Sequence, residues 1–197
     1  MSPELRQPLD PFPGLTTERL QLRELTARDA LSIRDMLSDP EVTRYHDLPT
    51  IETPHEALRF VAEMLHRRIN RQGIRWALVS KADQHFVGSI GLNHIFAPAR
   101  RASLGYELKK SSWGHGYATE AVRAVVDFAH GSLGLHRLEA SVVPENAASL
   151  RVLEKSGFQR EGLLRALGFF RGQFQDLVVL SRLSTDGRAP HSAAPER

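Results

Sequence analysis

A helical crossover that follows a run of hairpin-connected strands constrains the fold of this 197-residue chain more than any other feature. Three strand-like runs, residues 74–80, 85–95 and 102–108, are separated by turns and predict an antiparallel meander. An amphipathic helix over 117–133 and a strand over 138–143 follow the third run. Strands that a helix connects lie parallel in one sheet. The chain is therefore expected to form a mixed sheet, antiparallel first and parallel in the middle.

Shorter elements on both sides of the crossover complete the predicted fold. They are a strand at 19–23, helices that begin at Thr26 and Thr53 with capping-box spacing, a helix from Asn146 to Ser156, and strands at 158–162 and 174–183. The predicted order is β-α-α-β-β-β-α-β-α-β-β. The fold class is thus α/β, or mixed α+β: a central mixed, mostly antiparallel sheet of about seven strands with helices on both faces.

All of these elements lie within residues 15–183, which suits a single domain with a sizeable core. Residues 1–14 are rich in proline and poor in apolar residues, so we expect a flexible N-terminal arm. Residues 184–197 have no hydrophobic periodicity and predict a disordered tail.

Composition and charge exclude several classes of protein. The chain has no cysteine, which excludes a disulfide framework and thiol catalysis and favours the reducing cytoplasm. It has no apolar run long enough to span a membrane and no signal peptide at its start, so we expect no membrane partner. The formal charge of +3 is too small to indicate nucleic-acid binding. No histidine pair has metal-ligand spacing, so no metal site is expected.

The chemistry is expected at Gly114-His115-Gly116, directly before the long helix. Two glycines can turn backbone N–H groups toward one point, and the positive end of the helix dipole lies there, so the segment can hold a phosphate. A simple turn is the alternative. A P-loop is discounted because no Gly-Lys-Ser/Thr follows, and a dinucleotide fingerprint because Thr119 stands where Gly or Ala is needed.

Four ordered blocks carry a resemblance to a known family. They are Thr17–Leu20, Leu104–Leu108 with Trp113–Ala121, Asn146–Gly162, and Gly172–Asp176. Together they resemble the GNAT superfamily of acetyltransferases, and more narrowly its RimJ/RimL-type N-acetyltransferases. The resemblance implies a GNAT-like fold, acetyl-CoA as co-substrate, and direct transfer to an amine in a ternary complex.

The resemblance also implies which residues bind acetyl-CoA. They are Leu108, Lys109, Trp113, Gly114, His115, Gly116, Tyr117, Ala118, Thr119, Asn146 and Ser149. Three positions depart from the wider superfamily pattern. Trp113 replaces the first loop residue, Leu153 replaces a tyrosine that acts as an acid, and Gly168 replaces a carboxylate found in some members.

Two residues are the catalytic candidates. Glu107, at the end of the strand before the loop, is expected to take the amine proton through water; the alternative is a surface or ion-paired glutamate. Ser149 is expected to protonate the CoA thiolate; the alternative is a helix-start serine that only bonds backbone N–H groups.

The functional hypothesis is an acetyl-CoA-dependent N-acetyltransferase that acts on a peptide α-amine or a small-molecule amine. A non-catalytic acetyl-CoA sensor is the alternative, and a plain nucleotide-binding domain is a weaker one. Acceptor specificity is expected to lie within about residues 26–73, which include Arg44, Tyr45 and His46. The sequence leaves the acceptor open, and leaves the oligomeric state open between monomer and homodimer.

Overall fold

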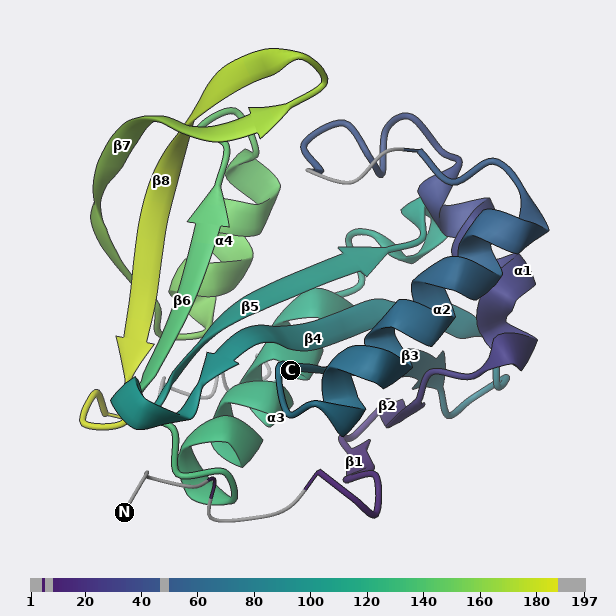
Figure 1. Ribbon diagram of the computed structural model, residues 1–197, viewed down its shortest axis with the longest axis horizontal. Coiled ribbons are helices and arrows are strands. Elements are labelled where there is room, and N and C mark those ends of the chain that lie inside the picture. Colours follow the sequence, from purple (N-terminus) through teal and green to yellow (C-terminus); the bar gives the residue numbers. More distant parts are fainter. Residues whose placement is uncertain (1–4, 6–8, 47–49, 188–197) are drawn as a thin grey trace, which may run out of the picture.

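The computed structural model describes residues 5, 9–46 and 50–187 and places them around one eight-stranded sheet (Figure 1). The strands are β1 (Leu15–Thr16), β2 (Leu20–Glu24), β3 (Ile74–Ser80), β4 (Phe86–Phe96), β5 (Arg101–Leu108), β6 (Arg137–Val142), β7 (Gln159–Phe170) and β8 (Gln173–Leu183). They lie in the order β1-β2-β3-β4-β5-β6-β8-β7. Only β5 and β6 pair in parallel, so the predicted mixed, mostly antiparallel sheet is confirmed.

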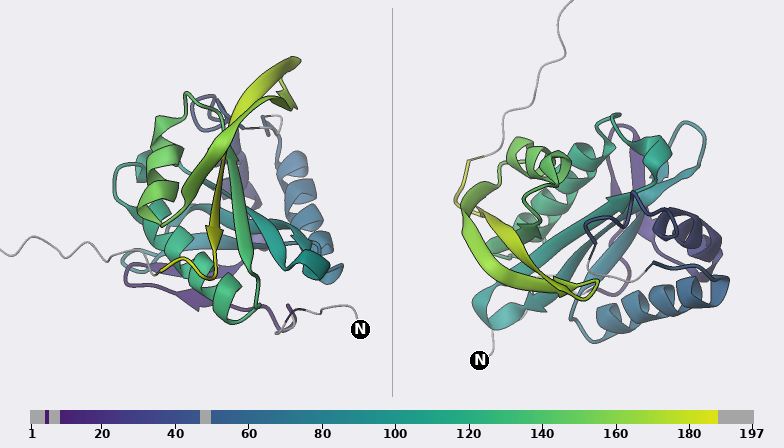
Figure 2. Two further views of the ribbon diagram at one scale, coloured as in Figure 1. Left: turned by 90° about the vertical axis from the view of Figure 1, so that its left-hand side faces the viewer. Right: turned by 90° about the horizontal axis from the view of Figure 1, so that it is seen from above.

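Two helical layers cover opposite faces of this sheet (Figure 2). The helices are α1 (Ala30–Leu37), α2 (Pro54–Ile69), α3 (Tyr117–Gly131) and α4 (Ala147–Lys155). Helices α1 and α2 share a buried cluster with Ala77 and Phe86 of the sheet. Helices α3 and α4 belong to the larger cluster on the other face. The predicted placement of helices on both faces is therefore confirmed.

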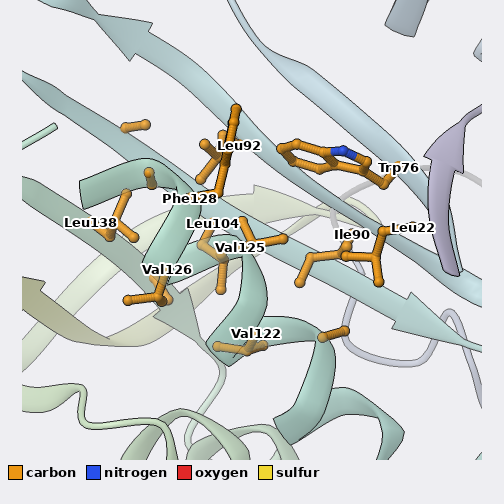
Figure 3. Close-up of a cluster of buried hydrophobic side chains, with 14 of the residues drawn as sticks. Leu22, Trp76, Ile90, Leu92, Leu104, Val122, Val125, Val126, Phe128 and Leu138 are labelled. Atoms are coloured by element: carbon orange, nitrogen blue, oxygen red, sulfur yellow. The ribbon is translucent and has the colours of Figure 1, made fainter. Parts of the chain in front are cut away.

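Trp76 belongs to the larger cluster and is fully buried (Figure 3). Its ring meets that of Phe128 from α3 edge to face, with centroids 5.6 Å apart. Phe12 meets the same ring at 6.0 Å, and the indole N–H donates to the Pro13 carbonyl at 2.7 Å. Part of the predicted N-terminal arm thus packs against the core. Residues 1–4 and 6–8 of that arm, and residues 188–197 of the predicted tail, lie outside the described residues.

The two predicted helix starts form as the sequence indicates. At Thr53 the hydroxyl accepts from the Glu56 N–H at 3.2 Å, and the Glu56 carboxylate accepts from the Thr53 N–H at 2.9 Å. Thr26 and Asp29 form the equivalent box before a short 3₁₀ turn that leads into α1. These local contacts satisfy N–H groups that a helix start leaves unpaired.

The prediction of about seven strands agrees with the observed sheet of eight. The strand that the sequence did not indicate is β1, which has only two residues and shows no alternation. The strand predicted at 158–162 runs on to Phe170, and most of β7 is exposed on both faces. Without a buried face there is no hydrophobic alternation to predict it from, and the β7–β8 register shifts twice within it.

Gly88 and Gly131 offer a matched test of the packing between β4 and β5. A Cβ at Gly88 would lie 2.3 Å from the Glu107 carbonyl oxygen, whereas one at Gly131, the last residue of α3, would meet nothing within 4 Å. We expect Gly88→Ala to lower the free energy of unfolding by about 1–3 kcal/mol. Gly131→Ala should raise it by up to about 1 kcal/mol, because alanine favours a helix. Urea unfolding of both variants checks this; equal stabilities would contradict the close approach.

Candidate active site

The glycine loop joins the end of β5 to the start of α3. Gly114 and Gly116 have φ of 77° and 79°, a left-handed conformation that favours glycine. Gly116 is the N-cap of α3, and its carbonyl accepts from the Glu120 N–H at 3.1 Å. Tyr117, Ala118 and Thr119 form the first turn of that helix. The loop therefore leads into the helix N-terminus through two left-handed glycines, where the unpaired N–H groups and the helix dipole would favour an anion.

Beside this loop, β5 and β6 stop pairing. Their ladder joins Arg101 to Arg137, Ala102 to Leu138 and Ser103 to Glu139, and goes no further. In Figure 1 the two strands begin side by side and then separate. We call this stretch, residues 104–108 of β5 and 140–142 of β6, the β5–β6 fork. One backbone edge of β5 is thus without a strand partner within the fork.

Strand alternation decides which backbone groups face the fork. The Lys109 N–H donates to the Val87 carbonyl at 2.9 Å, so the odd-numbered residues at this end of β5 point their backbone groups toward β4. Tyr106 and Leu108 consequently turn their N–H and C=O groups toward the fork. The Leu108 carbonyl already accepts from the Trp113 indole N–H at 3.0 Å. The Leu108 N–H points into the fork, where a thioester oxygen could accept it.

Ser149 lies on the side of β5 that carries α4. Asn146 is the N-cap of α4, and its side-chain oxygen accepts from the Ser149 N–H at 3.1 Å. The Ser149 hydroxyl lies 2.9 Å from the Tyr106 hydroxyl. Burial raises the pKa of Tyr106 to about 12, although the hydrogen bond with Ser149 opposes the rise. The two hydroxyls form a pair at the edge of the fork, and Tyr106 remains protonated at neutral pH.

Glu107 points to the opposite face of β5, toward α2. The Arg75 guanidinium donates to Oε1 of Glu107 at 2.6 Å, and the Ser89 hydroxyl donates to the same oxygen at 2.5 Å. Burial by itself would raise the pKa of Glu107, but Arg75, His46 and Ser89 lower it to about 2.

The structure thus places Glu107 in a buried ion pair, the geometry that the sequence left open as the alternative to a base. Its pKa in the folded state lies below the ordinary 4.5. The ionised pair therefore stabilises the fold above about pH 4.5, and this contribution is lost as the pH falls toward 2.

Arg19, directly before β2, contacts the glycine loop from the protein surface. Its guanidinium donates to the His115 carbonyl at 2.9 Å and lies 4.9 Å from the centre of the Tyr117 ring. It also pairs with Glu120 of α3 at 2.7 Å, and Glu120 accepts the Thr17 hydroxyl at 2.5 Å. The Thr17–Leu20 block is therefore joined to the loop, although it lies far from it in the sequence.

Three of these side chains were missed as functional candidates by sequence reasoning: Tyr106, Arg19 and Arg75. Tyr106 and Arg19 stand inside blocks of family resemblance, so the blocks contained the available signal. Arg75 lies in an otherwise apolar strand, and a charged residue there could have indicated a buried pair. Trp113 does not fill the core, since 44% of it is exposed.

The described residues add neither a metal centre nor a membrane-spanning helix. Across residues 5, 9–46 and 50–187, no three histidine, cysteine, aspartate or glutamate side chains are grouped to hold a metal ion. In the same part of the chain, no helix is long and apolar enough to cross a membrane.

Known proteins resemble this chain in sequence and in architecture. The chain is 37% identical over 170 residues to the uncharacterized N-acetyltransferase YoaA of Bacillus subtilis strain 168. The aligned region covers 86% of this chain and 96% of YoaA. It is 27% identical over 159 residues to spermidine N(1)-acetyltransferase of Escherichia coli K12, covering 81% and 83% of the two chains. Mycobacterium smegmatis RimJ, solved with CoA-disulfide, superposes with a TM-score of 0.83 over 94% of this chain and 93% of RimJ.

The RimJ likeness, at 21% identity, establishes the fold. The family is established by sequence. Residues 19–159 match the model of the acetyltransferase (GNAT) domain, and this range includes the glycine loop, the fork and the Tyr106–Ser149 pair. The chain therefore belongs to the GNAT family of N-acetyltransferases.

Proposed function

We propose that the chain transfers the acetyl group of acetyl-CoA directly to a primary amine while both substrates are bound. The observation that carries this proposal is the β5–β6 fork. An unpaired strand edge, a glycine loop at a helix start and a half-buried hydroxyl pair adjoin it. A covalent acetyl-cysteine intermediate is impossible in a chain without cysteine, which agrees with direct transfer.

Acetyl-CoA would be held by the residues that the family resemblance implies. The loop and first turn of α3 would hold the pyrophosphate: Gly114, His115, Gly116, Tyr117, Ala118 and Thr119. Leu108 and Asn146 would bond the pantetheine amides. Trp113 would close the loop against Leu108, as its indole bond supports. Because the Lys109 N–H is bonded to Val87, Lys109 would contribute through its carbonyl or its side chain.

The reaction forms a C–N bond and breaks the C–S bond of the thioester. Negative charge develops on the thioester oxygen, and a backbone N–H such as that of Leu108 would stabilise it. The CoA thiolate would leave and take a proton from the Ser149 hydroxyl, which contacts Tyr106 and would regain its proton from solvent. The amine loses a proton, which finally passes to solvent. Glu107, on the acceptor side of β5, would take part in this proton transfer.

The acceptor would be a peptide N-terminus or a small-molecule amine, reached from the face of α1 and α2. The named activity of the Escherichia coli relative, on spermidine, supports a small amine. The loop 39–46, with Arg44, Tyr45 and His46, faces that side, and the tip of the β7–β8 hairpin contacts it. There Arg171 donates to the Thr43 carbonyl at 2.7 Å. We place the enzyme in the cytoplasm because the chain has no cysteine.

An acetylation assay tests the proposed function. Purified protein with acetyl-CoA is incubated with spermidine, free L-amino acids and short peptides with free N-termini, and released CoA thiol and acetylated product are both measured. We expect one product per thiol with at least one acceptor class. Tight acetyl-CoA binding by calorimetry without product would support the sensor instead. Affinity for NAD or ATP but not CoA would overturn the donor assignment.

Arg19 should control donor affinity through the loop. Arg19→Gln removes the bond to the His115 carbonyl, and we expect the Kd for CoA to rise about tenfold, which corresponds to about 1.4 kcal/mol. Arg160→Gln is the control, since Arg160 forms a comparable exposed pair with Glu154 at 2.6 Å. Calorimetry with CoA gives both values. An unchanged Kd for Arg19→Gln would show that the loop holds its conformation without Arg19.

The hydroxyl pair should act on the chemical step. We expect Ser149→Ala to lower kcat about 100-fold and Tyr106→Phe about tenfold, with little change in the KM for acetyl-CoA. Ser132→Ala, at the exposed end of α3, is the control. Steady-state kinetics with both substrates varied measure the effect. A normal kcat for Ser149→Ala would show that Ser149 has no catalytic role and only forms hydrogen bonds at the start of α4.

A further inference from the structure

Glu107 is poorly suited to accept the amine proton itself. Only 5% of the residue is exposed, and Oε1 already accepts from Arg75 and Ser89. Its pKa of about 2 lies roughly six pH units below that of a peptide α-amine. A carboxylate so strongly paired holds a proton from an amine too weakly to assist attack. If Glu107 acts in proton transfer, it must act through a more basic neighbour.

That neighbour is His46. Oε2 of Glu107 is buried and has no hydrogen-bond partner among the described residues. The Nε2 atom of His46 lies 3.6 Å from it, an ion-pair distance just longer than a hydrogen bond. The His46 side chain is 21% exposed, against 3% for that of Glu107. The imidazole therefore connects a buried carboxylate to the side from which an amine would enter.

The position of His46 is set by contacts from two directions. The backbone N–H of His46 donates to the Thr43 carbonyl at 3.0 Å, and the backbone N–H of Thr43 donates to the Asp39 carbonyl at 3.1 Å. Arg171, at the tip of the β7–β8 hairpin, donates to the same Thr43 carbonyl. Glu107 directly precedes Leu108, whose N–H faces the fork. His46 therefore lies on the acceptor side of the strand end where the thioester would be held.

Charged groups from several elements lie around the His46 loop. Glu107 is the negative charge that faces His46, and it favours the imidazolium. Among the described residues, the other charged groups around this loop include Asp39 within it, Arg75 behind Glu107, Arg171 at the hairpin tip, Arg44 stacked on Tyr45, and Lys110 paired with Glu41.

We propose that His46 is the catalytic base of the acetyl transfer and that Glu107 is the residue that positions it. This inference rests on the proposed function. The neutral imidazole takes a proton from the amine as the C–N bond forms, and the imidazolium is stabilised by Glu107 until the proton leaves to solvent. The proton that reaches the CoA thiolate comes from the Ser149 side of β5, so the two transfers occur on opposite faces of one strand.

The first test is the pH dependence of kcat/KM for the best amine of the acetylation panel, at saturating acetyl-CoA. We expect the wild type to lose activity at low pH as one group is protonated. His46→Gln should lose about 100-fold at pH 7. Imidazole added to His46→Ala should restore activity in proportion to its unprotonated fraction. His136→Gln, at the start of β6 where the strands are still paired, should behave as wild type.

The second test separates positioning from structure. Glu107→Gln removes the negative charge beside the ring, so the NMR titration of the His46 imidazole and the acid limb of the pH profile should both move to lower pH. The titration needs no substrate, and circular dichroism checks the fold. If Glu107→Gln does not fold, the His46 variants and the imidazole rescue still decide the question.

The outcomes distinguish this inference from the proposed function. An active wild type with His46→Gln within threefold of it overturns the catalytic role of His46 and leaves the N-acetyltransferase intact. An unmoved His46 titration in folded Glu107→Gln overturns the positioning role. A wild type that acetylates none of the panel overturns the proposed function first.

Discussion

The end of the β5–β6 ladder after three residue pairs is the constraint on which the rest of the site depends. The helical crossover makes the two strands parallel, but β6 is paired along its whole length with β8 on its other side. Strand β5 is likewise paired with β4. Both strands are therefore held while their facing edges separate. The separation leaves the backbone edge at Tyr106 and Leu108 without a strand partner, while both strands stay paired on their other sides.

The alternation of a β-strand then divides the chemistry between two faces. Tyr106 points toward α4 and contacts Ser149, whereas Glu107 points toward α2 and contacts Arg75. In the proposed mechanism, successive residues of one strand would thus serve the leaving thiolate and the incoming amine from opposite sides of the sheet. Each face also has its own apolar cluster, so the two sets of polar groups are supported by separate packing.

Much of the fold could be predicted because most elements are amphipathic. Strand β3 begins and ends where its apolar run does, and the capping boxes mark both early helices. Strand β7 could not be predicted in full. It lies at the sheet edge, is exposed on both faces, and extends as half of a hairpin whose tip reaches the loop after α1. The extent of β7 is set by backbone hydrogen bonds to β8. Such bonds do not depend on side-chain type, so they leave no hydrophobic pattern in the sequence.

By itself, the sequence determined the class of fold and the family and indicated the glycine loop as the candidate donor site, because glycine placement, helix caps and hydrophobic periodicity act over a few neighbouring residues. It indicated Glu107 and Ser149 by position alone. Only the tertiary structure decided what these residues contact: His46 and Arg75 beside Glu107, Tyr106 beside Ser149, and Arg19 on the glycine loop. The physical reason is that such contacts depend on how whole layers pack. A carboxylate becomes a base, or the partner of one, through the charges that distant segments bring to it.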